Sequence, residues 1–527
     1  MTRHGRRAAV LASSLLLSVF AQTGVASAAA KKPAPAPAAT KKPTVTPPTK
    51  PATKPVVKPT PSKAAGPVKE AAPTLANRLA AVRTAKTINY YPSNAGWSAM
   101  WTHFDAVKIE ADLTKAAALG ADTVRVIVFP TAFGYPTPKA DYATKLSKFV
   151  SIADGEGLSV KLTLFDWWAG YSDAAGSAAW AKAVLAPYAN DPRVLSAELQ
   201  NEFDPTDADA VAWVRKLIPG VRAAVPTMPL TLSVSGTTGQ AGLTRIRTAL
   251  AGTPLDYLDF HFYGNSERAL AEIRKAQAAA APYPIVIGET GLSTATGSEG
   301  EQAAYLARVF EAAKVAGIGS VAPWTLSDFS AGAIPANSAV SKIPAQYKFG
   351  LYRADGSAKP AAAVVKTYWT GQAITSASVL DLGFEAAAGN SPWRPYLAED
   401  GAAVRARDTA RTGTWSAKFS GTNRSDTGLP SVRTAPVTPV QPGQKWHAEA
   451  WAKGQNVTGT SEIALSWFDA GDKWLGQASS KPVPAGTSGW TRLTVDTTAP
   501  AGAASVQLHL KSGDNKGAVW FDDVTLS

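Results

Sequence analysis

The sequence predicts an α/β protein in which a (β/α)8 barrel is followed by an all-β sandwich. Three observations lead to this prediction. Between residues 75 and 369, short apolar runs alternate with amphipathic stretches of helical period. Polar residues follow nearly every one of these runs, which is typical of the mouth of a barrel. After Thr370 the helical period gives way to short alternating segments bounded by turn residues.

The first region contains eight expected strands, each followed by a helix or loop. They are residues 87–91, 123–129, 160–165, 194–202, 230–234, 257–262, 285–288 and 320–324. Between the first two, Ile109, Leu113 and Ala116 have the spacing of a buried helical face. Eight strand–helix units in about 290 residues fit a barrel in number and length. An open, doubly wound sheet is the alternative, and the polar strand ends disfavour it.

The second region begins at Gly383-Phe384-Glu385 and has almost no helical period. Residues 463, 465 and 467 are apolar and share one face of a strand, as do residues 506, 508 and 510. This alternation predicts an antiparallel β-sandwich. We place the barrel domain at residues 75–372 and the sandwich domain at residues 378–527.

The first 28 residues predict a secretory signal peptide. Arg3, Arg6 and Arg7 precede an apolar run, and Ala26-Ser27-Ala28 offers a small-residue cleavage site. Residues 29–74 are rich in Pro, Ala, Thr and Lys and predict a disordered linker. We expect a secreted, extracellular protein, with cell-wall association also open, and no membrane contact once the signal peptide is removed.

Charge and cysteine content exclude several classes of function. The net charge is +13, but 12 of the 53 basic residues and none of the 40 acids lie in residues 1–69. The remaining 41 basic and 40 acidic side chains nearly cancel, so the folded part has no electrostatic signature of a nucleic-acid partner. The absence of cysteine excludes disulfides, thiolate metal sites and a thiol nucleophile.

Two strands of the predicted barrel end on carboxylates. Asn201-Glu202 ends the fourth strand and Glu289 ends the seventh. Parallel strands of a barrel present their carboxyl ends at one mouth, so both acids are expected to face each other. Two facing carboxylates are what the cleavage of a glycosidic bond requires.

The polar residues at the strand ends resemble those of glycoside hydrolase family 5, which contains cellulases and mannanases. The resemblance spans the barrel and rests on Gln200-Asn201-Glu202, His261-Phe262-Tyr263, Gly288-Glu289, and Phe349-Gly350-Leu351-Tyr352 with Asp355-Gly356 and Lys359-Pro360. It implies a retaining enzyme in which Glu202 is the acid/base and Glu289 the nucleophile. Retention requires two carboxyl groups about 5–5.5 Å apart, one protonated to release the leaving group and one ionised to attack the anomeric carbon.

Other residues at the barrel mouth are expected to bind substrate or support the two glutamates. Asn201 can bind the sugar 2-hydroxyl, and Arg125 near Glu289 would keep the nucleophile ionised. Tyr263 can donate to the same carboxylate, and His261 can hydrogen-bond the acid/base. Trp324 is a platform for the sugar face in the −1 subsite.

The third strand departs from the family. It ends at Asp166-Trp167-Trp168, where many relatives have a histidine. We expect Asp166 to contact a substrate hydroxyl, and Trp167 and Trp168 to form either a stacking subsite or loop packing. Trp97 and Trp101 are further subsite candidates of the same kind.

The predicted sandwich resembles the jelly-roll carbohydrate-binding modules that accompany such barrels. The resemblance rests on Gly383-Phe384-Glu385 and on Phe521-Asp522-Asp523-Val524, and it implies a structural calcium ion with Glu385 and Asp523 as ligands. If Trp446, Ala448 and Ala450 face the core, alternation places His447, Glu449 and Trp451 outward, where a tryptophan flanked by polar groups is a candidate glycan-binding face. The alternative is that most of these tryptophans belong to the core. Gln507, His509 and Lys511 lie opposite the row of Val506.

We therefore predict a secreted, monomeric, retaining endo-β-glycoside hydrolase that needs no cofactor or metal for catalysis. β-Mannan and β-1,4-glucan are the favoured polysaccharides. An exo-acting glycosidase or a transglycosylase can use the same two glutamates. A non-catalytic glycan-binding protein of the cell wall is the rival from another class.

Overall fold

The computed structural model describes residues 73–236, 238–371, 381–385, 393–397, 402–423, 429–434, 438–471 and 473–527. The predicted signal peptide and residues 29–72 of the predicted linker lie outside these ranges. Within the described ranges, no helix is both long and apolar enough to cross a membrane.

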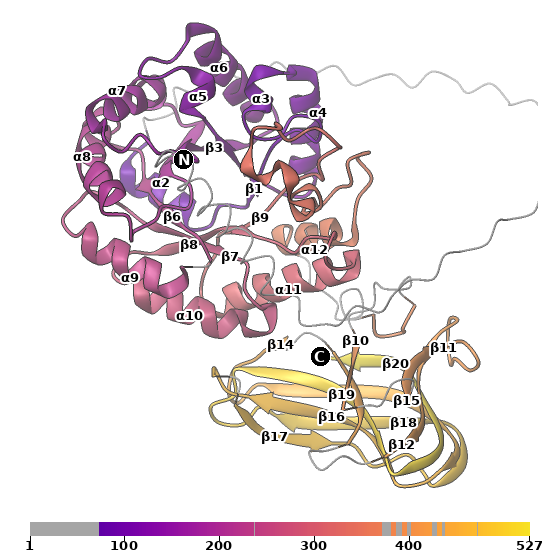
Figure 1. Ribbon diagram of the computed structural model, residues 1–527. Helices are drawn as coiled ribbons and strands as arrows, with labels where there is room; N and C mark the ends of the chain where they lie inside the picture. Colours follow the sequence, from indigo (N-terminus) through magenta and orange to yellow (C-terminus); the bar gives the residue numbers. More distant parts are fainter. Residues whose placement is uncertain are drawn as a thin grey trace, which may run out of the picture.

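The first part of the chain folds into the predicted barrel of parallel strands (Figure 1). Its strands are β1 (Thr87–Asn89), β2 (Thr123–Ile127), β3 (Ser159–Phe165), β4 (Val194–Gln200), β5 (Leu230–Thr231), β6 (Ser233–Val234), β7 (Leu258–Phe262), β8 (Ile285–Thr290) and β9 (Val321–Pro323). They pair in the orders β1-β2-β3-β4-β5 and β6-β7-β8-β9.

The two arcs of strands meet at two places. The expected fifth strand, residues 230–234, is interrupted at Leu232, and its halves β5 and β6 pair with β4 and β7 respectively. β9 lies beside β1, where the Asn89 carbonyl accepts a hydrogen bond from Leu326 N at 3.0 Å. The (β/α)8 prediction is confirmed, with its fifth strand in two pieces.

Helices surround the strands, as the alternating sequence pattern predicts. They are α2 (Leu75–Val82), α3 (Ala99–Thr102), α4 (Ala106–Ala118), α5 (Pro130–Phe133), α6 (Ala140–Gly155), α7 (Ala174–Leu185), α8 (Ala208–Ala224), α9 (Gly239–Ala249), α10 (Ala269–Ala280), α11 (Glu299–Val315) and α12 (Pro360–Trp369). Local sequence fixes several starts: Asp105 and Asp207 cap α4 and α8, and Ser298 with Glu301 forms a capping box on α11.

Two apolar regions stabilise the barrel. A large cluster lies between the strands and the outer helices and includes Trp101, Trp180 and Trp213, all essentially without solvent exposure. A small cluster beneath the amino ends of the strands joins Val82 at the end of α2 to Tyr257 and Val286. The amino end of the barrel is therefore closed, and its chemistry must face the other end.

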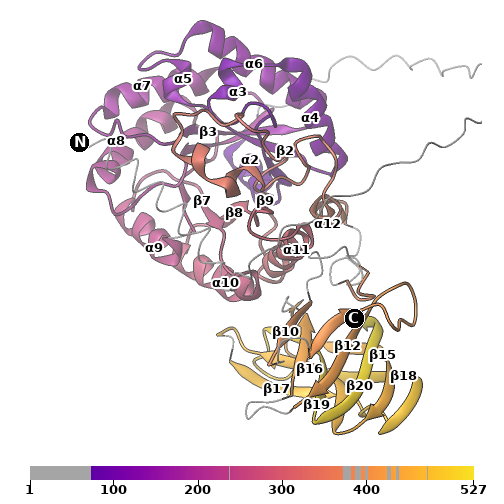
Figure 2. The same cartoon turned by 45° about the vertical axis from the view of Figure 1, so that its right-hand side comes forward.

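The second part of the chain is a sandwich of two antiparallel sheets (Figure 2). One sheet has the order β10-β13-β19-β16-β17, with β14 also paired to β19, and the other has the order β11-β12-β20-β15-β18. The strands are β10 (Trp393–Tyr396), β11 (Ala403–Ala406), β12 (Ser416–Thr422), β13 (Ser431–Thr434), β14 (Thr438–Pro439), β15 (Lys445–Val457), β16 (Thr460–Phe468), β17 (Trp474–Ser479), β18 (Gly486–Thr498), β19 (Ser505–Gly513) and β20 (Asn515–Leu526).

The sandwich has its own apolar core and also contacts the barrel. Leu465, Trp467 and Leu508 belong to a cluster that contains sandwich residues alone. β14 contacts α11 (Figure 1). Ala504 packs in the barrel's large cluster. The two cores are separate, and a small contact joins their domains.

Candidate active site

The two predicted catalytic glutamates lie together at the carboxyl ends of β4 and β8. Glu202 follows β4 in a left-handed conformation with φ 46°, which is uncommon for a residue with a side chain. Its backbone N–H donates to Ser233 Oγ at 2.7 Å, and Phe203 N donates to the Ser233 carbonyl at 2.9 Å. Strand β6 thus fixes the backbone that aims Glu202 into the mouth.

His261, on β7, lies between the two carboxyl groups. Its Nδ1 is 3.2 Å from Glu202 Oε1 and 3.5 Å from Glu289 Oε2. Oxygen atoms of both glutamates and a ring nitrogen of His261 all lie within 4.8 Å of one another. The structure brings the predicted pair together, and the distance is short enough for direct attack by one carboxylate.

Arg125, on β2, uses every one of its guanidinium donors in this site. Nε and Nη2 bind the two oxygens of Glu198 at 2.8 and 3.0 Å. Nη1 donates to Asn89 Oδ1 at 2.8 Å and to Glu289 Oε1 at 2.6 Å, and Nη2 also donates to Asn201 Oδ1 at 2.7 Å. A guanidinium has five N–H groups, so this side chain is fully held in one orientation.

Glu289 is buried but receives two strong donors. Besides Arg125, the Tyr263 hydroxyl donates to Glu289 Oε2 at 2.9 Å. Burial raises the pKa of Glu289 to about 7, while Arg125 and the Tyr263 hydroxyl act in the opposite direction. These two donors favour the ionised form that a nucleophile requires.

Glu202 has the opposite electrostatic environment. Burial, followed by the neighbouring carboxylates of Glu289 and Asp166, raises the pKa of Glu202 well above its usual range. Its nearest ring nitrogen belongs to His261, and burial together with Arg125 holds the pKa of that imidazole well below its usual range. Of the two glutamates, Glu289 therefore ionises first and Glu202 keeps its proton.

Asp166 lies beside Asn201 at the end of β3. Its Oδ1 accepts from Asn201 Nδ2 at 2.9 Å, whereas its buried Oδ2 has no hydrogen-bond partner among the described residues. Burial raises the pKa of Asp166 to about 7. The amide of Asn201 is thus oriented from both sides, by Arg125 and by Asp166.

The predicted aromatic residues differ in their surroundings. Trp324 is 7% exposed and lies 6.0 Å, ring centre to ring centre, from both Tyr91 and Trp97. Trp167 and Trp168 are half-buried in the segment after β3, and Trp167 has φ 53°. Trp167 and Trp168 are thus partly exposed, whereas Trp324 and Trp97 are buried.

Trp101 is not a subsite residue, contrary to one sequence prediction. Its ring is fully buried, stacks with Phe104, meets Phe133 edge-on, and donates from Nε1 to the Ile127 carbonyl at 2.7 Å. A tryptophan in a short helix after a strand has the same sequence signal whether it faces the mouth or the core, so the pattern could not separate the two cases.

Three charged residues of the site were missed from the sequence. Lys161, Glu198 and Asp259 point into the barrel from β3, β4 and β7 and are essentially buried. Barrel interiors are usually filled by branched apolar side chains. The available signal is a charged residue in the middle of each apolar run, which ordinary strand alternation also produces.

Two groups of acidic and imidazole side chains have the close spacing that a cation requires. Within the described part of the chain these are Glu198, Asp259 and His261, and Glu202, His261 and Glu289. Lys161 lies within the first group and bonds to Glu198 and Asp259, while Arg125 bonds to Glu289. Protein cations already supply positive charge to these carboxylates.

The residues implied as calcium ligands bind the same loop of the sandwich. Glu385 Oε1 accepts from Thr414 N and Trp415 N at 2.7 Å each. Asp523 pairs with Arg411 at 2.5 Å and accepts from the Thr412 hydroxyl. Protein donors thus occupy both carboxylates in this arrangement, and the calcium site stays a prediction.

A parallel barrel with two carboxyl groups facing each other at the carboxyl ends of β4 and β8 defines the class of (β/α)8 glycosidases. The sequence of the barrel narrows this class. Residues 84–330 match the family model of cellulase, glycosyl hydrolase family 5, so the chain contains a glycosyl hydrolase family 5 domain. The predicted resemblance is confirmed.

Solved structures with a similar fold include three glycosidase-family proteins. An exo-beta-1,4-mannosidase from Opitutaceae bacterium strain TAV5 is 21% identical, with a TM-score of 0.46, over 54% of this chain and 59% of that chain. A GH5_18 protein from Streptomyces cattleya, in complex with GlcNAc, is 20% identical, with a TM-score of 0.46, over 55% and 82%. A GH5_18 protein from Bifidobacterium longum subsp. longum ATCC 55813 is 18% identical, with a TM-score of 0.46, over 55% and 79%.

The match spans about 59% of the length of the first of these structures. Among curated proteins, none matches this chain. Similarity at this level leaves the substrate of the chain open.

Proposed function

We propose that this protein hydrolyses a β-linked glycan with retention of configuration, using Glu289 as nucleophile and Glu202 as acid/base. The observation that supports this most strongly is the closeness of the two carboxyl groups, with oxygens within 4.8 Å of each other. Retaining enzymes hold their carboxyls about 5–5.5 Å apart, whereas inverting enzymes leave room for a water between them. The unequal environments of the two acids support the same division of roles.

The reaction proceeds in two displacements. A Glu289 oxygen attacks the anomeric carbon while the bond to the leaving oxygen breaks and that oxygen takes the proton of Glu202. The products are a free sugar hydroxyl and an ester between the sugar and Glu289. Glu202, now ionised, removes a proton from water, whose oxygen attacks the anomeric carbon and releases Glu289 as a carboxylate.

Neighbouring residues support each displacement. Arg125 and Tyr263 stabilise the Glu289 carboxylate that forms at the end of the reaction. Asn201, fixed by Arg125 and Asp166, presents its amide toward the sugar 2-hydroxyl, a contact that strengthens in the transition state. Trp324, Trp167 and Trp168 offer aromatic faces to the apolar faces of pyranose rings.

The proposed substrate is an internal bond of β-mannan or β-1,4-glucan in the extracellular space. The test is sizing of products from mannan, glucomannan, β-glucans, cellulose and xylan, with Glu289→Gln as the matched inactive control. Oligosaccharides of mixed length would support endo action. Monosaccharides alone would indicate an exo-acting enzyme, and lengthened products a transglycosylase. Equal release by Glu289→Gln would overturn the assignment of the nucleophile.

The sandwich is proposed to bind glycan on the outer face of sheet β10-β13-β19-β16-β17. Register places Tyr396, Lys511 and Glu462 in one row on this face, and Lys511 donates to Gln477 at 2.6 Å. Tyr396 and Trp474 are 40% and 57% exposed on the same face. Polar groups between exposed rings suit a sugar chain.

The opposite outer face is a poorer candidate. The guanidinium of Arg411 covers the ring of Trp451 at 3.9 Å, and Glu449 is paired with Arg492 at 2.6 Å. We expect Trp474→Ala to weaken retention on insoluble polysaccharide about tenfold, consistent with the cost of one stacking contact. Val404→Ala, an exposed apolar change on the other sheet, is the control and should bind normally. Unchanged retention in Trp474→Ala would reject this face.

Export and calcium binding are separate proposals. We propose that residues 1–28 direct secretion, which amino-terminal sequencing of the protein from culture medium tests. A calcium-dependent rise in the melting temperature, lost in Glu385→Gln, would support the calcium prediction. We expect size-exclusion chromatography with light scattering to report a monomer.

A further inference from the structure

Two chains of buried charged and polar side chains lie beneath the active site, one leading to Glu289 and the other to Glu202. Lys161 contacts both chains. Its Nζ lies 3.2 Å from Glu198 Oε2 and forms an ion pair with Asp259 Oδ2. We propose that Lys161 is a positioning residue that fixes the proton distribution of the catalytic pair through two arms, one ending at Glu289 and the other at Glu202. This inference rests on the function proposed above.

The first arm runs from Lys161 through Glu198 and Arg125 to Glu289. Glu198 is fully buried, and its Oε2 accepts from Arg125 Nε at 2.8 Å and from Thr163 Oγ1 at 2.9 Å and forms an ion pair with Lys161. Although burial alone would raise it, Arg125 and Lys161 hold the pKa of Glu198 below its usual range. A permanently ionised Glu198 holds the guanidinium plane that donates to the nucleophile.

The second arm runs from Lys161 through Asp259 and His261 to Glu202. Asp259 Oδ1 lies 4.0 Å from His261 Nε2, and neither atom has a hydrogen-bond partner among the described residues. His261 Nδ1 lies 3.2 Å from Glu202 Oε1. The imidazole therefore has a carboxylate facing each of its nitrogens.

The chain makes room for Asp259 at one specific residue. A Cβ added to Gly288 would lie 2.1 and 2.2 Å from the two Asp259 oxygens. Gly288 directly precedes the nucleophile on β8, and its carbonyl accepts from Asn89 Nδ2 at 2.9 Å. The Asp259 carboxylate thus occupies the place where any other residue at this position would have its side chain.

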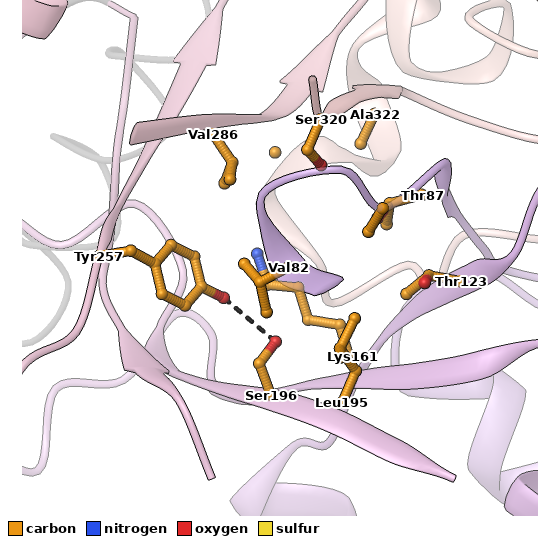
Figure 3. Close-up of a pocket in the computed structure, with 12 residues that line it drawn as sticks. Val82, Thr87, Thr123, Lys161, Leu195, Ser196, Tyr257, Val286, Ser320 and Ala322 are labelled. Carbon is orange, nitrogen blue, oxygen red and sulfur yellow. Dashed lines mark hydrogen bonds between the residues drawn. The ribbon is translucent and has the colours of Figure 1, made fainter. Parts of the chain in front are cut away.

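Lys161 cannot act by touching the substrate, because it lies toward the opposite end of the barrel. Figure 3 shows it lining a small cavity with Tyr257 and Ser196, whose hydroxyls are hydrogen-bonded at 3.1 Å. The cavity holds about 10 Å³, the room of a single water, and Val82 at the end of α2 lines it. Its influence on the chemistry must pass through the two arms.

Charge balance explains why a cation is needed there. The ionisable groups that face this interior come from β1, β2, β3, β4, β7 and β8 and from residues next to their ends: Tyr91, Arg125, Lys161, Asp166, Glu198, Glu202, Tyr257, Asp259, His261, Tyr263 and Glu289. Arg125 alone cannot balance Glu198, Asp259 and Glu289 when all three are ionised. Although burial opposes it, the carboxylates of Asp259 and Glu198 raise the pKa of Lys161, which stays charged.

Asp259, when ionised, selects one tautomer of His261. Burial raises the pKa of Asp259, and the cation of Lys161 acts in the opposite direction. A carboxylate facing Nε2 favours the proton on that nitrogen. Nδ1 also lies 3.5 Å from Glu289 Oε2, but that oxygen already accepts from the Tyr263 hydroxyl, so Nδ1 is left bare toward Glu202. A bare Nδ1 accepts a hydrogen bond from protonated Glu202 and gives none to the ionised form. Glu202 therefore keeps its proton before the first displacement and readily takes one from water in the second.

The first test observes His261 directly in the full-length protein. Nitrogen-15 NMR of labelled histidine should show neutral His261 with its proton on Nε2, the signal being assigned by its loss in His261→Gln. In Asp259→Asn the amide can donate to Nε2, and the proton should move to Nδ1. This measurement needs no substrate, so it stands even if the proposed hydrolysis fails.

The second test separates the arms by pH dependence of kcat/KM. Asp259→Asn should lower the apparent pKa of the alkaline limb by about one pH unit, because an Nδ1–H group favours ionised Glu202. The apparent pKa of the acid limb should stay unchanged. Lys161→Met should lower the apparent pKa of the alkaline limb, because Asp259 takes up a proton. It should also raise the apparent pKa of the acid limb by a similar amount, because Glu289 loses a compensating positive charge. The double variant should restore the acid limb toward that of the unmodified protein.

Lys359→Met is the matched control for losing a buried lysine. Lys359 pairs with Asp328 at 2.7 Å, outside both arms, and both side chains are buried. It should lower the melting temperature without moving the His261 proton or either limb. An Nδ1–H tautomer in the unmodified protein, unshifted limbs in Asp259→Asn, or equal shifts in Lys359→Met would each overturn the inference.

Discussion

At the scale of single residues, the unequal settings of Glu202 and Glu289 determine the chemistry. Glu289 is buried and accepts from Arg125 and Tyr263. The Glu202 side chain is 11% exposed, and its carboxyl group lies within hydrogen-bond distance of the His261 imidazole, whose pKa is well below its usual range. Desolvation raises the pKa of both carboxyl groups, but the hydrogen-bond donors lower only that of Glu289, so the two pKa values differ.

The pH dependence of activity should reflect this difference. Glu289 must be ionised to attack, so kcat/KM should rise with pH as it loses its proton, with an apparent pKa of about 7 for the acid limb. Activity should fall again at higher pH, where Glu202 loses the proton it must donate. The apparent constants belong to the pair, because the two groups interact. An optimum below about pH 5 would contradict this arrangement.

Glu202 should also lower the stability of the fold at neutral pH. Its pKa is raised on folding, so the native state binds more protons than the unfolded state above about pH 4, and stability falls as pH rises. Glu202→Gln removes this cost. Its melting temperature should exceed that of the unmodified protein by a few degrees at pH 8 and should match it near pH 4. A gap that stays constant with pH would exclude this explanation.

The sequence and the family resemblance together predict Glu202, Glu289, Asn201, His261 and Tyr263, which lie at or close to strand ends, and Arg125, which lies in the middle of β2. The structure brings all six into one network, because parallel strands present their carboxyl ends at the same mouth. Lys161, Glu198 and Asp259 were missed because a charge in the middle of a strand has the same pattern whether it faces solvent or a buried interior. Periodicity predicts on which side of the strand a side chain lies. Whether that side faces solvent or a buried interior depends on closure of the barrel.

At the scale of elements, close approach between neighbouring strands limits what the sequence can contain. β7 and β8 come so near that the Asp259 carboxylate lies where a side chain of residue 288 would be. The fifth strand breaks at Leu232, and the Ser233 that follows holds the backbone of Glu202. The sequence predicts one strand there, since nothing in residues 230–234 reveals the break.

Gly288→Ala should therefore destabilise the barrel. Overpacking of this kind costs about 1–3 kcal/mol, and displacement of a buried carboxylate adds to it. We expect a loss of several degrees in melting temperature and a large fall in activity. Gly155→Ala is the control, because a Cβ there meets nothing within 4 Å and alanine is the better helix former. Equal melting temperatures of the two variants would show that β7 and β8 adapt freely.

At the scale of the whole molecule, two separate apolar cores should unfold as two units. The barrel and sandwich clusters share no residue, and the described contact between the domains involves β14, Ala504 and α11. Calorimetry should therefore resolve two transitions. Gly288→Ala should shift one of them and Trp467→Ala, in the sandwich core, the other. A single transition shifted by both variants would show that the two cores are cooperative.

The location of the charges has a consequence for how such an enzyme can diversify. Every group that sets the protonation of the catalytic pair belongs to a strand or directly follows one, whereas Trp167 and Trp168 belong to a connecting segment. The strands thus hold the two glutamates and the groups proposed to set their protonation, whereas part of the proposed substrate contact lies in a connecting segment. Exchange of the loops at the mouth can therefore change the substrate without changing the pKa values of the two glutamates. The same barrel can then support several substrate specificities.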